Sequence, residues 1–372
     1  MNARRIGFGA LAGLAAAMGL GRFVYTPILP LMEAQTGASP QSTAVVATFN
    51  YLGYFLGAVA LAIWPRFARS PLMLRASLVA LVASEVAMVL AVNVPWWSAV
   101  RLIAGVASAV VFVYCAGAVA GTASAGIAFA GVGVGIAVSG VLVVGLGEVV
   151  DWRSLWWLSA LLTAAFGWFA WGVPPGASRA PATSDGAPRA GVAGWSLGLS
   201  YFLEGLGYIV LGTFLVAAVA TGGRSWEGPA AWVIVGLAAA ASPMIWARLR
   251  RYRSAEALLV IALLLQVVSA VLPALVHGAA AAAVSAVLFG GTFIGAVMLS
   301  MEAGADIGIP RSAAVLTAAY GIGQILGPLV VAPMLGDGYD AAFLTAGGVL
   351  VVSAVLAAVA GRARPAPVTG PV

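Results

Sequence analysis

The sequence predicts an all-α integral membrane protein with twelve transmembrane helices, arranged as two pseudo-symmetric six-helix halves. Three observations support this fold class. Apolar residues make up 62% of the 372-residue chain and charged residues only 8%, a composition outside the range of soluble globular proteins. Long apolar runs recur along the whole chain. Residues 19–30 are echoed by residues 205–216, an offset of 186 residues, which is half of the chain length.

The twelve expected spans are apolar runs of roughly 18 residues or more, the length that crosses the hydrocarbon core as a helix. Proline, glycine or arginine separates one run from the next. We expect the spans at residues 6–32, 42–63, 72–93, 97–121, 125–147, 153–172, 195–219, 229–247, 255–276, 279–301, 312–335 and 341–361.

The orientation follows from arginine, since all eighteen basic residues are arginine. If the N-terminus is cytoplasmic, fourteen of them fall on the cytoplasmic side, and only Arg153 and Arg224 fall outside. Arg22 and Arg101 lie within spans. The positive-inside rule therefore predicts that both termini lie in the cytoplasm. We expect a multi-pass protein of a bacterial cytoplasmic (inner) membrane. The net charge of +6 reflects this topology and predicts no nucleic-acid partner.

The half-length repeat predicts two domains. Residues 1–172 form the N-terminal six-helix bundle, 173–194 a cytoplasmic linker rich in proline and glycine, and 195–372 the C-terminal bundle. A repeat of this kind in a very apolar chain is typical of secondary transporters, whose substrate site lies near the midplane between the repeats. We expect the chain to act as a monomer.

Residues that would carry enzyme or metal chemistry are scarce. Cys115 is the only cysteine and His277 the only histidine, which excludes a disulfide, a thiolate metal site and a histidine-based triad. Ser139 lacks the preceding glycine of a serine-hydrolase elbow. The sequence therefore predicts no enzyme, no metal and no cofactor, and no segment is long enough for a soluble signalling domain.

Two segments carry a resemblance to a known family. Residues 19–30, GLGRFVYTPILP, and residues 50–57, NYLGYFLG, resemble the YbfB/YjiJ-type branch of the major facilitator superfamily. The resemblance extends over essentially the whole chain. It implies the major facilitator fold and transport by rocking two halves around a central site.

Two superfamily motifs are partly present. Arg101, Gly105 and Ala109 match the pattern R-x-x-Q-G-x-G-x-A of the fourth span, which the resemblance links to proton coupling. Arg66 and Arg69 match the two arginines of the D-R-x-G-R gating loop, whose acidic residue is missing here. The resemblance thus implies a gating loop without its acidic latch.

Polar side chains recur at helical spacing on the spans that the resemblance places around the cavity. They come from the first, second, seventh and eleventh spans. The predicted substrate-binding residues are Arg22, Tyr25, Asn50, Tyr54, Tyr208, Tyr320 and Gln324.

Glu204 is the predicted proton carrier, together with Arg101 for proton coupling. A charge at a helix centre costs about 2.5 to 3.5 kcal/mol on insertion scales, so Arg22 and Glu204 are expected to have a use. We expect them to pair in the empty cavity, with a substrate anion displacing Glu204. The structural alternatives are a permanent ion pair between Arg22 and Glu204, or hydrogen bonds from Arg22 to carbonyls that Pro27 and Pro30 expose.

Two further groups have structural alternatives. Arg101 lies near a helix end, where snorkelling and packing compete with proton coupling. Glu85 in the third span is expected to be a structural partner, for instance of Arg101.

The predicted function is a secondary active transporter that moves a small anionic or zwitterionic organic solute by alternating access, coupled to protons. Its partners are that solute, protons and membrane lipids. The alternative is a proton-driven exporter of amphiphilic, drug-like compounds, which predicts an aromatic cavity that tolerates changes at Arg22. Uniport without a proton stays open.

Overall fold

The computed structural model describes residues 3–120, 122, 124–176, 191–222, 224–309 and 312–363. The first half comprises α1 (Ala3–Leu14), a π-helical turn η1 (Ala15–Leu20), α2 (Tyr25–Thr36), α3 (Pro40–Ile63), a 3-10 turn η2 (Phe67–Arg69), α4 (Pro71–Ala87), α5 (Val94–Val119), α6 (Ala125–Leu146) and α7 (Trp152–Ala170). The second comprises α8 (Gly191–Gly222), α9 (Glu227–Leu249), α10 (Ala255–Leu275), α11 (Ala279–Ile307), α12 (Ser312–Val331), a 3-10 turn η3 (Ala332–Asp337) and α13 (Asp340–Arg362). Most of the predicted linker, residues 177–190, lies outside the described residues.

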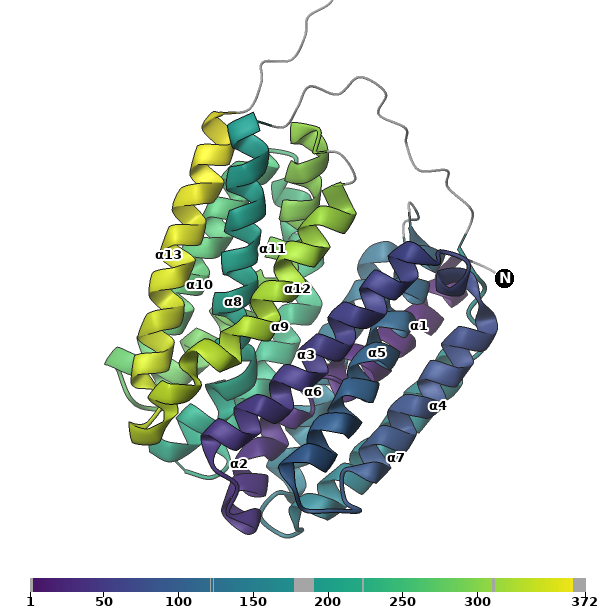
Figure 1. Cartoon of the computed structure of the whole chain (residues 1–372), viewed down its shortest axis with the longest axis vertical. Coiled ribbons are helices and arrows are strands. Elements are labelled where there is room, and N and C mark those ends of the chain that lie inside the picture. Colours follow the sequence, from purple (N-terminus) through teal and green to yellow (C-terminus); the bar gives the residue numbers. More distant parts are fainter. Residues whose placement is uncertain are drawn as a thin grey trace, which may run out of the picture.

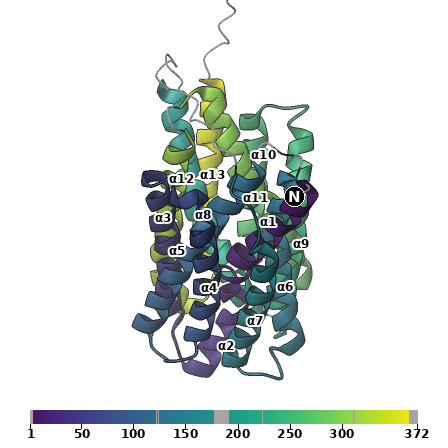
Figure 2. The ribbon, with the colours of Figure 1, turned by 90° about the vertical axis from the view of Figure 1, so that its right-hand side faces the viewer.

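The helices form two bundles that lie side by side (Figure 1), one of helices α1 to α7 and one of helices α8 to α13. Between the bundles, α6 packs against α9 and α3 against α12. In Figure 1 the α4 and α7 ribbons lie at the outer edge of the first bundle, while α3 and α12 adjoin across the middle. The view turned by 90° (Figure 2) shows the helices running roughly along one common direction, as helices that cross one bilayer do.

Ten helical segments of the described chain are long and apolar enough to cross a membrane. The other two predicted spans, 72–93 and 153–172, correspond to the shorter helices α4 and α7, which pack against each other. The prediction of a span to residue 93 was too long, because α4 ends at Ala87. Its last carbonyls are taken by the indole N–H groups of the next helix: Trp96 donates to Ala87 and Trp97 to Met88.

The first predicted span, 6–32, lies within one membrane-length segment, Arg4–Thr36, whose helix is broken at residues 21–24. Pro27 has no N–H with which to bond the carbonyl of Phe23, and the Thr26 N–H bonds that carbonyl instead over 3.2 Å. A π-helical turn precedes the break. There Gly19 meets Gly135 of α6 so closely that a Cβ on Gly19 would lie 2.3 Å from the Gly135 Cα. The break leaves the Gly21 and Arg22 carbonyls open to a partner from another helix.

Several helices begin at side-chain caps, which satisfy N–H groups that a helix start leaves open. Asp151 caps α7 by accepting from the Ser154 N–H over 2.8 Å. Hydrogen bonds from the Ser154 side chain and from this N–H lower the pKa of the exposed Asp151 carboxyl. The other capping residues are Ser39, Ser70, Asn93 and Ser254. Short polar turns therefore separate the apolar helices, and hydrogen bonds from their capping side chains determine where these helices start.

The two residue types that occur once in the chain lie in very different places. Cys115 of α5 is fully buried, and a Cβ added at Gly13 of α1 would lie 2.6 Å from its sulfur. His277 is exposed in the turn between α10 and α11, with its Nε2 3.9 Å from an Asp340 carboxylate oxygen.

Candidate functional site

A cavity of roughly 450 Å³ lies between the two halves. This volume is within the range of small-molecule sites. Its lining comes from both halves, reaches Phe23 at one end and extends to Glu302 near the end of α11. Its walls are mainly aromatic, with the rings of Phe23, Tyr54, Phe112, Phe129, Tyr201, Tyr208, Phe293 and Tyr320.

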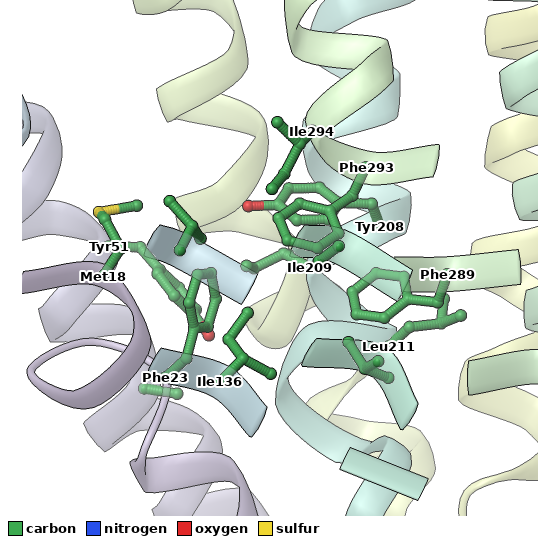
Figure 3. Close-up of a cluster of buried hydrophobic side chains, with 14 of the residues drawn as sticks. Met18, Phe23, Tyr51, Ile136, Tyr208, Ile209, Leu211, Phe289, Phe293 and Ile294 are labelled. Carbon is green, nitrogen blue, oxygen red and sulfur yellow. The ribbon is translucent and has the colours of Figure 1, made fainter. Parts of the chain in front are cut away.

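Direct contacts between the two halves close the molecule beyond the Phe23 end of the cavity. Thr26 of α2 donates to the Gly212 carbonyl of α8 over 2.6 Å, and the hydroxyls of Tyr51 and Thr213 lie 2.8 Å apart. Figure 3 shows the apolar side chains that meet in this region, with Phe23 and Ile136 of the first half facing Ile209 and its neighbours of the second. The cavity therefore extends from this closed region toward the end of the bundle where α11 ends and α12 begins.

Glycines on α6 and α9 bring the two halves into backbone contact. A Cβ on Gly236 of α9 would lie 2.2 Å from the Ala137 nitrogen of α6, and one on Gly133 would lie 2.2 Å from the Ala240 nitrogen. Gly140 of α6 faces the Val233 backbone in the same way, with 2.8 Å from its added Cβ to the nitrogen. Any larger side chain at these positions would force the two halves apart.

Arg22 lies in the broken part of the first span and lines the cavity, with only 3% of its surface exposed. Its Nη2 donates to the Oε1 of Gln324 over 2.9 Å, and its guanidinium carbon lies 4.3 Å from the centre of the Tyr54 ring. Its Nε is buried and has no hydrogen-bond partner among the described residues. The wall of the cavity thus contains a buried cation.

Gln324 links Arg22 to the aromatic wall of the second half. Its Nε2 donates to the hydroxyl of Tyr208. The Tyr208 ring stacks near-parallel on Tyr320, with centroids 5.4 Å apart, and lies 6.1 Å from the ring of Phe293. Figure 3 shows the Tyr208 and Phe293 rings one above the other. One polar chain therefore runs from the first half into a stack of rings in the second.

Tyr25 and Asn50 are placed differently from the sequence prediction, because neither lines this cavity. The Tyr25 hydroxyl donates to the Thr43 carbonyl, and the Asn50 amide donates to the Arg101 carbonyl. Both side chains tie neighbouring helices of the first half together.

Arg101 holds the break in the first span. Its two terminal nitrogens donate to the carbonyls of Gly21 and Arg22 over 2.8 and 2.5 Å. Carbonyl bonding was a structural alternative for Arg22, but Arg101 is the residue that bonds carbonyls of the break. The Glu85 carboxylate accepts from Thr163 over 3.0 Å, and Arg101 interacts with Glu85 electrostatically without a direct ion pair among the described residues.

Glu204 does not pair with Arg22, which corrects the expectation of an ion pair in the empty cavity. It is fully buried, does not line the cavity, and accepts from Gln266 of α10 over 3.3 Å, while its Oε2 has no partner. Tyr201 and Tyr208 of the same helix do line the cavity. At about 100° per residue Glu204 is rotated by about 60° from Tyr201, enough to turn it toward α10.

The predicted gating arginines, Arg66 and Arg69, lie exposed in and beside η2, between α3 and α4. Arg66 lies over the ring of Phe67, with 4.9 Å from its guanidinium carbon to the ring centre. On the other half, Arg250 at the end of α9 forms ion pairs with Glu302 at 2.6 Å and with Asp306 at 3.7 Å. Arg250 was not singled out from the sequence.

Half of the aromatic lining, namely Phe23, Phe112, Phe129 and Phe293, was not predicted from the sequence. An aromatic residue in an apolar span gives no sequence signal that separates a cavity wall from a lipid-facing surface. Helical spacing from the neighbouring polar residues supplied a signal only for Tyr201, which shares a face with Tyr208.

Comparison with known proteins identifies the fold and the family. The structure is similar to that of a bacterial homolog of the human lysosomal transporter Spinster, in an inward-facing and occupied conformation, with a TM-score of 0.71, 14% identity, and coverage of 97% of this chain and 98% of that one. It is also similar to a mutant of the nucleoside transporter NupG, with a TM-score of 0.69, 13% identity, and the same two coverages. No curated protein sequence matches the chain.

These likenesses establish the major facilitator fold, with two six-helix halves. The family model described as "Uncharacterised MFS-type transporter YbfB" matches residues 14–358, nearly the whole chain. The chain belongs to this YbfB-type family of major facilitator superfamily membrane transporters.

Proposed function

We propose that the protein is a secondary active transporter that binds a small anionic or zwitterionic organic solute in the cavity between its halves. One observation carries this proposal: Arg22 is a buried cation that lines the cavity and has an unpartnered Nε–H. A carboxylate that reached this donor would form a charge-assisted hydrogen bond, the stronger kind.

Alternating access is supported by the way the halves meet. The halves meet through close glycine contacts between α6 and α9 and through two hydrogen bonds, one from Thr26 to Gly212 and one between the hydroxyls of Tyr51 and Thr213. These contacts can separate at limited cost, because each is a single hydrogen bond or a van der Waals contact. Separation at this end, with closure at the other, would move the site from one side of the membrane to the other.

Proton coupling is assigned to Glu204. Burial without a cationic partner strongly disfavours the charged carboxylate, so the neutral, protonated form is favoured in the described conformation. Glu204 lies on the same helix as Tyr201 and Tyr208, which line the cavity. A movement of α8 on solute binding would therefore change the surroundings of Glu204, and loss of its proton would in turn favour a more hydrated arrangement.

The proposed setting is a bacterial cytoplasmic membrane, with both termini in the cytoplasm and one chain as the working unit. The cluster of arginines at the ends of α9 and α13 and in η2 supports this orientation. In that orientation the cavity extends toward the cytoplasm.

The test is transport in proteoliposomes, with a pH gradient imposed across the membrane. Flux of an organic anion should rise with the gradient in the unmodified protein. Arg22→Gln should abolish flux, while Arg4→Gln, which removes an exposed arginine at the start of α1, should leave it intact. Glu204→Gln should retain binding and lose the response to the gradient. A normal pH response in Glu204→Gln would overturn the proton assignment.

A second function, proton-driven export of amphiphilic compounds, is favoured by the aromatic and thioether walls of the same cavity. The export function and the transport of an anionic solute predict different effects of substituting Arg22. Binding of an uncharged amphiphile that survives Arg22→Ala would support export over recognition through charge.

A further inference from the structure

The positive and the negative side chain of the cavity lie far apart along its length. Among the described residues, Arg22 and Glu302 are the charged side chains that line it. The Arg22 guanidinium carbon lies 5.2 Å from the centre of the Phe23 ring, which lies 6.4 Å from the Phe293 ring. Arg22 therefore lies in the same part of the cavity as Phe293. Glu302 lies nine residues further along α11, which is about 13 Å along the helix axis.

Glu302 also forms an ion pair. Its carboxylate lies 2.6 Å from the Nε of Arg250, an arginine at the end of α9. The other nearby carboxylate on the second half, Glu204, faces Gln266 and not the cavity. A cation placed beside Arg22 would therefore meet no carboxylate and would be repelled by the guanidinium.

The walls around Arg22 offer apolar contact. Rings from both halves and the thioethers of Met18, Met298 and Met301 surround the space. On one side the rings of Tyr54, Phe112 and Phe129 form an edge-to-face series, with successive centroids 6.2 and 6.0 Å apart. Aromatic and thioether surfaces of this kind favour a flat apolar group, which gains both burial and ring contacts.

We propose that the ligand of this cavity is a monoanion with an apolar, ring-sized body, such as an arylalkanoic acid in its carboxylate form, and that zwitterions are rejected. This inference rests on the proposed function and narrows its solute class. The carboxylate accepts from the Arg22 guanidinium at the cavity wall, and the body lies among the rings toward Met298 and Met301. An α-amino acid carries its ammonium one carbon away from the carboxylate, where the cavity supplies only Arg22, Gln324 and aromatic rings.

Binding at this position also acts on the link between the halves. Gln324 connects Arg22 to Tyr208 in the empty cavity. A carboxylate that engages Arg22 competes with the Gln324 oxygen for the same guanidinium. The ligand that fits therefore loosens one bond between the halves as it binds, which an uncharged amphiphile would not do.

The experiment compares probes that share one skeleton, using the purified full chain and measuring dissociation constants by calorimetry and thermal stability. The probes are 3-phenylpropionate, phenylalanine, 3-phenylpropylamine and propionate. We expect 3-phenylpropionate to bind about tenfold or more tightly than phenylalanine, because the added ammonium is buried unpaired. The amine should not bind, and propionate should bind weakly because it lacks the ring.

Variants separate the contribution of charge from that of the walls. Arg22→Gln should abolish binding of 3-phenylpropionate, and Arg4→Gln should not change it. If Arg22→Gln fails to fold, Phe293→Leu keeps the charge and removes one ring: it should weaken 3-phenylpropionate and leave propionate unchanged. Equal or tighter binding of phenylalanine, or no binding of any probe, would overturn the inference.

The outcomes also separate this inference from the proposed function. Arginine-dependent binding of phenylalanine would leave transport of an organic solute standing and reject the monoanion class. Selective binding of 3-phenylpropionate without any flux in proteoliposomes would support the ligand class and reject transport.

Discussion

Thr26 and Gly212 occupy equivalent positions in the two sequence repeats and are hydrogen-bonded to each other. The Thr26 hydroxyl donates to the Gly212 carbonyl over 2.6 Å, and the two residues are 186 positions apart, the same offset that relates 19–30 to 205–216. Residues related by a two-fold axis can touch each other only where they lie beside that axis. The pseudo-two-fold axis therefore passes near this bond, in the closed region where the halves separate if access alternates.

Removing this bond should favour the conformation in which the region is open. Thr26→Val keeps the side-chain shape and removes the donor, at a cost of about 0.5 to 1.5 kcal/mol to the described conformation. The population of that conformation relative to the open one should fall by about two- to tenfold. Faster hydrogen exchange in α2 and α8 near the bond would report the change. Thr292→Val is the control, because Thr292 donates to Leu288 of its own helix. The same effect in both variants would contradict this assignment.

A methyl group at Gly236 should prevent closure between α6 and α9. The added Cβ would lie 2.2 Å from the backbone nitrogen of Ala137, which cannot move as a side chain could. We expect Gly236→Ala to lower transport at least about tenfold, because overpacking of about 1 to 3 kcal/mol falls on one conformation only. Gly145→Ala in α6, where nothing lies within 4 Å, should transport normally. Normal flux in Gly236→Ala would show that this contact is not required.

Substitution of Arg101 distinguishes a positioning role from proton coupling. Arg101→Gln removes two charge-assisted hydrogen bonds to the carbonyls of Gly21 and Arg22, each worth about 1.5 to 3 kcal/mol. We expect a lower melting temperature together with weaker ligand binding at Arg22, and partial rescue by Arg101→Lys, which can reach one carbonyl. A variant with normal melting and binding that loses only its response to pH would instead favour proton coupling.

The cap of α7 should depend on pH in a predictable direction. Because the hydrogen bond from Ser154 lowers the pKa of Asp151, its stabilisation is present above the ordinary aspartate pKa of about 3.9 and is lost as pH falls through the lowered value. Asp151→Ala should raise hydrogen exchange of the first turn of α7 about fivefold near pH 7, as expected for a cap worth about 1 kcal/mol. Asp151→Asn keeps a cap oxygen without a titrating charge, so its exchange should lack the acid-dependent component.

Apolar runs and turn residues predicted the helices well, because burial in lipid requires long, internally bonded segments. The broken first span was not predicted. Its sequence contains Pro27 and Pro30, which weaken the helix locally. The carbonyls that the break opens are bonded by Arg101 from another helix. A contact between spans 80 residues apart leaves no pattern within either span.

The candidate site likewise contains residues that the sequence predicts and residues whose position depends on contacts between helices. Polar residues in apolar spans are conspicuous, and Arg22, Tyr54, Tyr208, Tyr320 and Gln324 all line the cavity as predicted. Spacing alone could not separate Glu204 from Tyr208, because a rotation of about 40° lies within one helical face. That difference decides whether a side chain meets the solute or a neighbouring helix, and it is set by how α8 packs against α10.

The burial of Cys115 makes this chain a convenient carrier for site-specific labels. Its thiol lies inside the first half against Gly13, where the space is too small for even a methyl group on the glycine. Water-soluble thiol reagents should not reach it in the folded protein. A pair of cysteines introduced on facing surfaces of the two halves could therefore carry fluorophores or spin probes in an otherwise native sequence, and the opening of either side could be followed directly as a change in distance.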